Sequence, residues 1–408
     1  MKSAPVSQRE RIVTIDVIRG FALFGIFLVN MPLFHSPAYL DMYPDYSGVD
    51  YWLDILLQMF VQTKFYTIFS FLFGLGFYIF MSRAEEKGLK VKRLFSRRLF
   101  ILLLFGTVHL VFFWYGDILH TYALAGFLLL LFYKRKPKTI LIWAFSLLGV
   151  FYLLMSSSYA IPAPMFEEVM QQMEQKNEEK MDEYVAMYES APYLEWVGYR
   201  IGAELLPRVG QEFIVIIEIL AMFLFGLYAG KVGIFQSYTA HKKKIKGVWL
   251  TAFILSIPLA GMVAALKMNA VDHGVYQQMS VQFFTGLSGV TLCFFYITSI
   301  TLLMQKDTWQ KLLRPLGYMG QMALTNYLMQ TLISVFIFLG LNFYGKVSLT
   351  EGTLIVIVIL ILQIIISQVW MKHFRFGPME WLWRTWTYGY RQPMKRTEKI
   401  SSTTNHSV

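Results

Sequence analysis

The chain has 408 residues, of which 56% are hydrophobic, 17% aromatic and only 15% charged, with a formal net charge of +11. Soluble domains carry about 25% charged residues, so this composition excludes an ordinary soluble enzyme and indicates a membrane protein. No basic stripe with base-stacking aromatic residues stands apart from the apolar runs, and we expect no nucleic-acid partner. The single cysteine, Cys293, excludes an intrachain disulfide and a cysteine-based zinc or iron–sulfur site.

Ten apolar runs are long enough to be considered as membrane spans, since a spanning helix needs about 20 mostly apolar residues. Their approximate bounds are 14–33, 64–81, 99–115, 118–133, 139–155, 213–230, 247–266, 281–304, 316–340 and 353–371. The fourth run is short, opens with polar residues, and is separated from the third by little more than Gly116 and Asp117. We therefore predict an all-α, polytopic transmembrane helical bundle of about ten helices, with a tight hairpin between the third and fourth.

Lys and Arg residues are concentrated at the two termini and in alternate loops. Most of the 37 lie on one side of the predicted bundle, in the segments 1–13, 82–98, 134–138, 231–246, 305–314 and 372–408. Because cytoplasmic loops carry an excess of Lys and Arg, we expect both termini in the cytoplasm. The expected location is the plasma membrane, with the lipid bilayer as the chain's first partner.

The loop 156–212 is rich in acidic residues and divides the spans into two groups, residues 1–155 and 213–396. Its middle has the apolar spacing of an amphipathic helix on the outer surface. The run FGPMEWLWRTWTYGYR, near the end of the second group, has the Trp, Tyr and Arg content of an interfacial segment. Residues 397–408 are polar, and we predict a disordered tail there.

Polar groups inside a bilayer are costly, so each is a candidate functional residue. Asp16 and Arg19 lie three apart near the inner end of the first run. They either pair with each other, or Arg19 holds a phosphate or carboxylate with its planar guanidinium. Asn30 lies near the outer end of the same run and needs hydrogen-bond partners there.

The segment HLVFFWYGDILHTY carries the densest set of reactive side chains. His109 lies well within an apolar run, and Asp117 and His120 are spaced to share one helical face. A carboxylate can orient an imidazole as a general base, or the two groups can ligate a metal. The simpler alternative is that Asp117 caps a turn and His120 sits at the wet interface. We expect no resident metal.

Several blocks of the sequence, taken together, resemble a known family. IDVIRGFALFGIFLVN, KFYTIFSFLFGLG, HLVFFWYGDILHTYALAG, MGQMALTNY and FGPMEWLWR occur in the order found in the YeiB-type family of multi-pass bacterial membrane proteins. That family is similar, more distantly, to transmembrane acyltransferases such as heparan-alpha-glucosaminide N-acetyltransferase. The shared element is Asp-x-x-Arg-Gly followed by Asn, here Asp16, Arg19, Gly20 and Asn30.

The resemblance implies that residues 1–155 form an acyltransferase-like core. In such enzymes an acyl-CoA donor enters from the cytoplasm, the acceptor is met across the membrane, and a His beyond the Asn of the first helix takes part in catalysis. His35 is the histidine that follows Asn30 here, but it lies closer to the Asn than in the acetyltransferase. His109 and His120 are the other candidates.

The leading hypothesis is an acyltransferase that moves an acyl group from cytoplasmic acyl-CoA to an extracytoplasmic glycan, lipid or other envelope component. Arg19 would hold the donor, a His would act as general base, and Asn30 would donate a hydrogen bond to the developing oxyanion. A transporter would instead use Asp117 and the histidines as a proton relay. A membrane scaffold that binds partners through its acidic outer helix is the third alternative.

Overall fold

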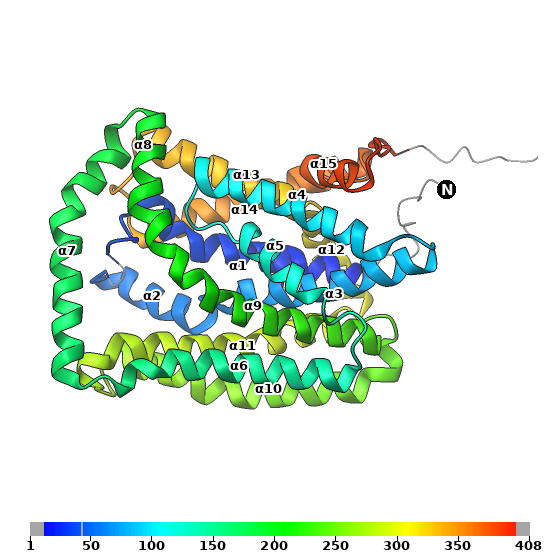
Figure 1. The fold of residues 1–408 in the computed structure, drawn as a ribbon, viewed down its shortest axis with the longest axis horizontal. Coiled ribbons are helices and arrows are strands. Elements are labelled where there is room, and N and C mark those ends of the chain that lie inside the picture. The colour runs from blue at the N-terminus through cyan, green and yellow to red at the C-terminus, as the bar shows by residue number, and fades with distance from the viewer. Residues whose placement is uncertain (1–11, 42–43, 397–408) are drawn as a thin grey trace, which may run out of the picture.

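The computed structural model describes residues 12–41 and 44–396, and these form a bundle of helices (Figure 1). Its α-helices are α1 (Val13–His35), α2 (Gly48–Phe60), α3 (Lys64–Glu86), α4 (Val91–Phe112), α5 (Leu119–Leu129), α6 (Pro137–Ser156), α7 (Ala163–Ser190), α8 (Tyr193–Arg200), α9 (Leu206–Val232), α10 (Tyr238–Lys267), α11 (Gln277–Leu303), α12 (Asp307–Gln321), α13 (Ala323–Val335), α14 (Leu349–His373) and α15 (Pro378–Tyr388). Short 3-10 or π segments are η2 (Ser157–Ala160), η3 (Ile201–Leu205), η4 (Gly274–Tyr276) and η5 (Phe336–Gly340). The described residues contain no β-strand, and their only bridge pairs Phe374 with Lys395.

Nine helical stretches in the described part of the chain are long and apolar enough to cross a membrane. They correspond to nine of the ten predicted runs, and the all-α polytopic bundle is confirmed. The remaining run forms α5, which has 11 residues. At 1.5 Å per residue this helix is about 16 Å long, roughly half of a hydrocarbon core of about 30 Å. The fourth run is therefore a half-length helix and not a full span.

Two further predicted boundaries differ from the structure. The run 316–340 is not one helix, because the backbone leaves the helical geometry at Met322 and divides it into α12 and α13. The outer loop is shorter than predicted, since α8, η3 and α9 follow one another as a single apolar stretch, Tyr193–Val232. The amphipathic helix expected within that loop is α7, which lies across one end of the bundle (Figure 1).

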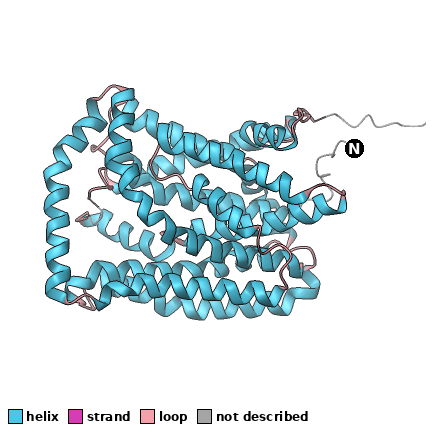
Figure 2. Ribbon diagram, viewed as in Figure 1, coloured by secondary structure: helices cyan, strands magenta, loops and turns pink. Residues whose placement is uncertain are grey.

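The first residues of α1 and the whole of α15 lie at the opposite end of the bundle from α7 (Figure 1). We call these the terminal end and the α7 end. Figure 2 shows that most loops lie at these two ends, whereas the loop after α4 runs into the bundle. The distribution of Lys and Arg predicts that the terminal end faces the cytoplasm, and that orientation remains a prediction. The predicted tail, 397–408, lies outside the described residues.

The helix that carries the Asp-x-x-Arg-Gly element is held against α12 by two glycines. A Cβ atom at Gly20 would overlap the backbone of Leu316, and one at Gly320 would overlap the carbonyl oxygen of Asp16. The two helix backbones therefore touch directly, as small residues allow in membrane bundles. This glycine contact fixes the position of Arg19, one residue before Gly20.

The predicted interfacial segment forms the short helix α15, which packs against α4 and α13 at the terminal end. Glu380 accepts hydrogen bonds from the backbone N–H groups of Leu324 (2.6 Å) and Thr325 (3.1 Å) and from the Thr325 hydroxyl (2.6 Å). Burial raises the pKa of the Glu380 carboxyl, and these hydrogen bonds oppose that rise. Trp383 donates from its indole N–H to the carbonyl oxygen of Arg98 on α4 (2.9 Å). These contacts make α15 an integral part of the bundle.

Candidate active site

The candidate site forms where the chain leaves α4 and turns back into the bundle. Residues 113–118 between α4 and α5 are not helical, and Trp114, Tyr115 and Asp117 within them are buried. Irregular backbone at membrane depth is tolerated only where protein covers it or where it lines a cavity. Such interruptions cost backbone hydrogen bonds, so this loop is a candidate for a functional element.

The Asp117 carboxylate is the centre of the site, and its side chain has no exposed surface. One oxygen, Oδ1, lies 2.8 Å from Nδ1 of His109. The other, Oδ2, accepts from the backbone N–H of His120 and from His120 Nδ1, both at 2.9 Å. One carboxylate thus caps the first turn of α5 and orients two imidazoles, one from each flanking helix.

His109 has the geometry of an oriented general base. Because an ionised Asp117 carboxylate can only accept, Nδ1 of His109 is the donor in this contact, and in the singly protonated tautomer the lone pair is on Nε2. Nε2 is buried and has no hydrogen-bond partner among the described residues. The ring is surrounded by aromatic side chains, with Tyr327 at 5.4 Å and Trp114 at 6.4 Å between centroids. An imidazole with a free Nε2 can take a proton from a substrate.

His120 is held differently, because both of its nitrogens face carboxylates. Nδ1 donates to Asp117, and Nε2 lies 3.1 Å from Oε1 of Glu212 on α9. Thr121 donates a short hydrogen bond to the same Glu212 oxygen. Two carboxylate partners favour the doubly protonated, cationic ring. His120 therefore positions Asp117 and links it to α9, and it has no free nitrogen to act as a base.

Gly106 allows the two helices of the site to approach. It lies one turn before His109 on α4, and a Cβ atom there would overlap the backbone nitrogen of His120 at the start of α5. Any side chain at this position must push α5 away and lengthen the contacts of Asp117.

We expect Gly106→Ala to lower the free energy of unfolding by about 1–3 kcal/mol, the usual cost of overpacking, and to weaken any activity of the site. Gly76→Ala is the matched control, because a Cβ atom at Gly76 meets nothing within 4 Å. Thermal unfolding of the two purified variants in the same detergent measures the difference. Equal unfolding temperatures would show that the α4–α5 contact is not as tight as described.

The structure does not gather all the predicted site residues into one cluster. His109, Asp117 and His120 meet. His35, at the end of α1, is buried with both ring nitrogens unpartnered among the described residues, and its ring packs near Phe338, 5.7 Å between centroids. Asn30 is partly exposed on α1. Arg19 lies at the terminal end, 3.3 Å from Asp16.

The sequence interpretation did not single out Glu212, which falls at the edge of the predicted outer loop. Its role depends on the continuous stretch from α8 to α9, which brings it opposite His120. The only sequence signal is an acid next to a long apolar run. In the described part of the chain, no three His, Cys, Asp or Glu side chains are arranged to hold a metal ion.

Comparison with known proteins now decides the family. The model of the heparan-alpha-glucosaminide N-acetyltransferase catalytic family matches residues 11–260, more than half of the chain. The chain belongs to this acetyltransferase-like family. The matched segment contains α1, α4 and α5, and so all six predicted site residues. A second model, of a protein family of unknown function, DUF418, matches residues 229–390.

Within this family the chain is of the YeiB type. YxaH, an uncharacterised protein of Bacillus subtilis (strain 168), is 36% identical over 97% of this chain and 99% of its own length. An uncharacterised 39.9 kDa protein of Bacillus acidopullulyticus is 29% identical over 96% of this chain and 97% of its own. YeiB of Escherichia coli (strain K12), also uncharacterised, is 26% identical over 93% and 96%. No solved structure matches the chain. The nine apolar helical stretches of residues 12–41 and 44–396, together with the family, identify a multi-pass membrane protein.

Proposed function

We propose that this protein is a membrane acyltransferase in which His109 is the general base. The observation that supports the proposal best is the Asp117–His109 pair, with Nδ1 held at 2.8 Å and Nε2 buried and free. The family match adds the class of reaction, since it covers the segment that contains this pair. The donor in the proposal is a cytoplasmic acyl-CoA, and the acceptor is an extracytoplasmic hydroxyl or amine of an envelope glycan or lipid.

The proposed step is one of proton transfer and acyl exchange. Nε2 of His109 takes the proton of the acceptor O–H or N–H while the acceptor atom attacks the thioester carbonyl carbon. The C–S bond then breaks, and the proton on Nε2 passes to the departing thiolate of CoA. Asp117 stabilises the imidazolium that exists between these two events. Asn30 is proposed to donate a hydrogen bond to the oxyanion and Arg19 to bind the donor.

Incubation of labelled acyl-CoA with membranes from cells that express the protein tests this function. We expect protein-dependent transfer of label to a lipid or glycan fraction of the envelope, and none in membranes from cells without the protein. Acetyl-CoA and a long-chain acyl-CoA should both be used as donors, which also identifies the chain length of the transferred acyl group. Absence of transfer with either donor would count against an acyltransferase.

A second candidate is a proton-coupled transporter in the plasma membrane. The specific observation in its favour is the continuous series of contacts from Glu212 through His120 and Asp117 to His109. Four titratable groups in hydrogen-bond contact are what a proton relay requires. Proteoliposomes that acidify with a substrate gradient, and fail to transfer label, would favour this alternative.

A further inference from the structure

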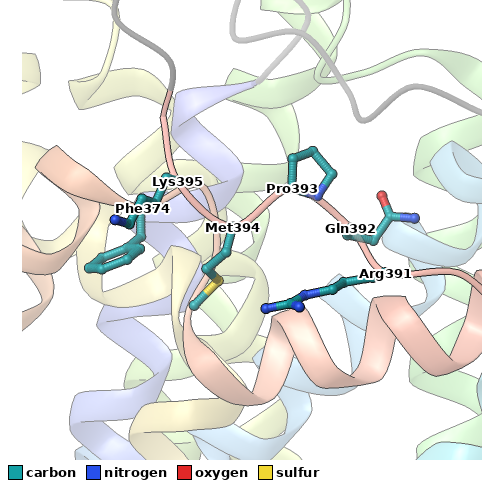
Figure 3. A pocket seen from close by; sticks show the side chains of 6 residues that line it. All are labelled: Phe374, Arg391, Gln392, Pro393, Met394 and Lys395. Atoms are coloured by element: carbon teal, nitrogen blue, oxygen red, sulfur yellow. The ribbon is translucent and has the colours of Figure 1, made fainter.

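A hollow of about 590 Å³ lies at the terminal end of the bundle, where the chain after α15 folds back over that helix. It is lined by Phe374, Arg391, Gln392, Pro393, Met394 and Lys395 (Figure 3). We call residues 391–396, which form most of its wall, the return segment. Arg391 and Met394 point toward one another beneath this segment (Figure 3), so a cationic and an apolar side chain lie together on one side of it.

Contacts with both neighbouring helices fix the return segment. An antiparallel bridge pairs Lys395 with Phe374, the residue that directly follows α14. The indole N–H of Trp381, on α15, donates to the carbonyl oxygen of Gln392 (2.7 Å). The hollow is therefore built into the fold, and a ligand that binds there loses little binding energy to the ordering of the protein.

The polar side chains of the hollow are cations and hydrogen-bond donors. Arg391 and Lys395 are exposed, and neither forms an ion pair within residues 12–41 and 44–396. The guanidinium carbon of Arg391 lies 5.8 Å from the centroid of the Trp381 ring. Gln392 is 2% exposed, and its Nε2 donor has no acceptor in the described part of the chain. A ligand with several anionic or carbonyl oxygens would satisfy these three groups.

The surroundings of the hollow carry a positive charge. Residues 372–396 contain six Lys or Arg and a single acid, Glu380. The Glu380 carboxylate accepts hydrogen bonds at the start of α13, from the backbone N–H of Leu324 and from the hydroxyl of Thr325. Its charge is thus used within the bundle, and this stretch has a net positive potential, which attracts anions.

Aromatic side chains indicate that the hollow lies at the membrane interface. The indole of Trp370 stacks on the Phe374 ring, with 4.2 Å between centroids, and Trp386 on α15 is exposed. Trp side chains gather at the depth of the lipid headgroups. The terminal end is predicted to face the cytoplasm, and the cytoplasmic leaflet presents anionic headgroups that attract clustered Lys and Arg residues. The most abundant anion at this depth is therefore a lipid headgroup.

We propose that the hollow binds the headgroup of an anionic phospholipid of the cytoplasmic leaflet, with phosphatidylglycerol as the representative ligand. The phosphate lies between Arg391, whose planar guanidinium pairs with two of its oxygens, and Lys395, which acts as a point charge. The amide of Gln392 donates to an oxygen of the headgroup or of the ester linkage. Phe374 and Met394 contact the first carbons of the acyl chains. An apolar lining beside two cations fits an amphiphile better than a soluble anion.

Thermal unfolding of the purified full-length protein in dodecyl maltoside, with increasing amounts of phosphatidylglycerol, tests the proposal. A ligand that binds the folded state stabilises it, so we expect a saturable rise in unfolding temperature. Phosphatidylcholine, which has no net charge, should give no such rise. The double variant Arg391→Gln with Lys395→Gln should weaken the apparent affinity for phosphatidylglycerol by about 10-fold or more. Arg391→Lys keeps the charge without the planar fork, and an intermediate affinity is expected.

The double variant Lys92→Gln with Arg93→Gln is the matched control. Both residues are exposed at the start of α4, which lies at the same end of the bundle (Figure 1), and the loss of charge is the same. This variant should bind phosphatidylglycerol as the wild type does. Equal weakening in the two double variants would show a general attraction between charges and would overturn the site.

Two further outcomes would also contradict the proposal. Wild-type affinity in the Arg391 and Lys395 double variant would show that the lipid does not bind at the hollow. Glycerol 1-phosphate carries the same phosphate without acyl chains, and we expect it to bind much more weakly than the lipid. If it raises the unfolding temperature with the affinity of phosphatidylglycerol, and this depends on Arg391, the ligand is a soluble phosphate and the assignment to a lipid is wrong.

Discussion

His109→Gln is expected to lower the rate of acyl transfer by about 10²–10⁴-fold, the usual contribution of a positioned general base. Glutamine is similar in size and can still donate a hydrogen bond toward Asp117, so the contact seen at 2.8 Å has a substitute. It cannot take a proton from an acceptor hydroxyl. We therefore expect the variant to be made and inserted normally while the rate of acyl transfer, measured as label incorporated per unit of purified protein, falls.

His373→Gln is the matched control for this experiment. His373 is exposed at the end of α14, so the same chemical change there should leave the rate unchanged. His35→Gln separates the two candidate bases, because both nitrogens of His35 are also unpartnered among the described residues. Retention of most of the activity in His109→Gln, with its loss in His35→Gln, would move the base to the end of α1.

Arg200→Met is expected to lower the free energy of unfolding by about 3–5 kcal/mol, the cost of removing one partner from a buried ion pair. Arg200 and Glu204 have no exposed side-chain surface, and Nε lies 2.8 Å from Oε2. The hydroxyls of Tyr184 and Tyr188, on α7, donate to the other oxygen of Glu204. Without Arg200, the Glu204 carboxylate keeps these donors but loses the only cation paired with it in the described part of the chain.

Arg200 also contacts α4, the helix that carries His109. Nη2 of Arg200 donates to the carbonyl oxygen of Leu110 (3.3 Å), which directly follows His109 on α4. Thermal unfolding in detergent measures the stability change, and Lys346→Met is its control. Lys346 pairs with Glu189 at 3.7 Å in an exposed contact, which contributes at most about 1 kcal/mol. Equal losses of unfolding free energy in the two variants would show that the buried Arg200–Glu204 pair stabilises the protein no more than an exposed ion pair does.

The sequence predicts the membrane-spanning helices well, because a run of about 20 apolar residues is a direct consequence of bilayer thickness. The sequence-based prediction of spans fails where a contact with a distant part of the chain interrupts a helix. The fourth run is half-length because Asp117 ends the preceding irregular loop and starts α5 in the interior. The ninth run breaks at Met322, next to the α13 terminus that Glu380 of α15 caps. Such partners are far apart in the sequence, and hydropathy contains no information about them.

The same limit applies to the site. His109 was recognisable as a polar group in an apolar run, and the spacing of Asp117 and His120 was recognisable as a helical turn. The sequence did not show which of the two histidines is the base and which positions Asp117. That difference depends on Glu212 of α9, which contacts the second nitrogen of His120.

Release of free CoA from acyl-CoA by the purified protein, with an envelope extract as acceptor, tests the central claim most directly. The only cysteine, Cys293, is fully buried, so a thiol reagent reports CoA with little background from the protein. We predict acceptor-dependent release by the wild type and by His373→Gln, and release at least about 100-fold slower by His109→Gln. Equal release by all three proteins would contradict an Asp117-oriented His109 as the base of an acyl transfer.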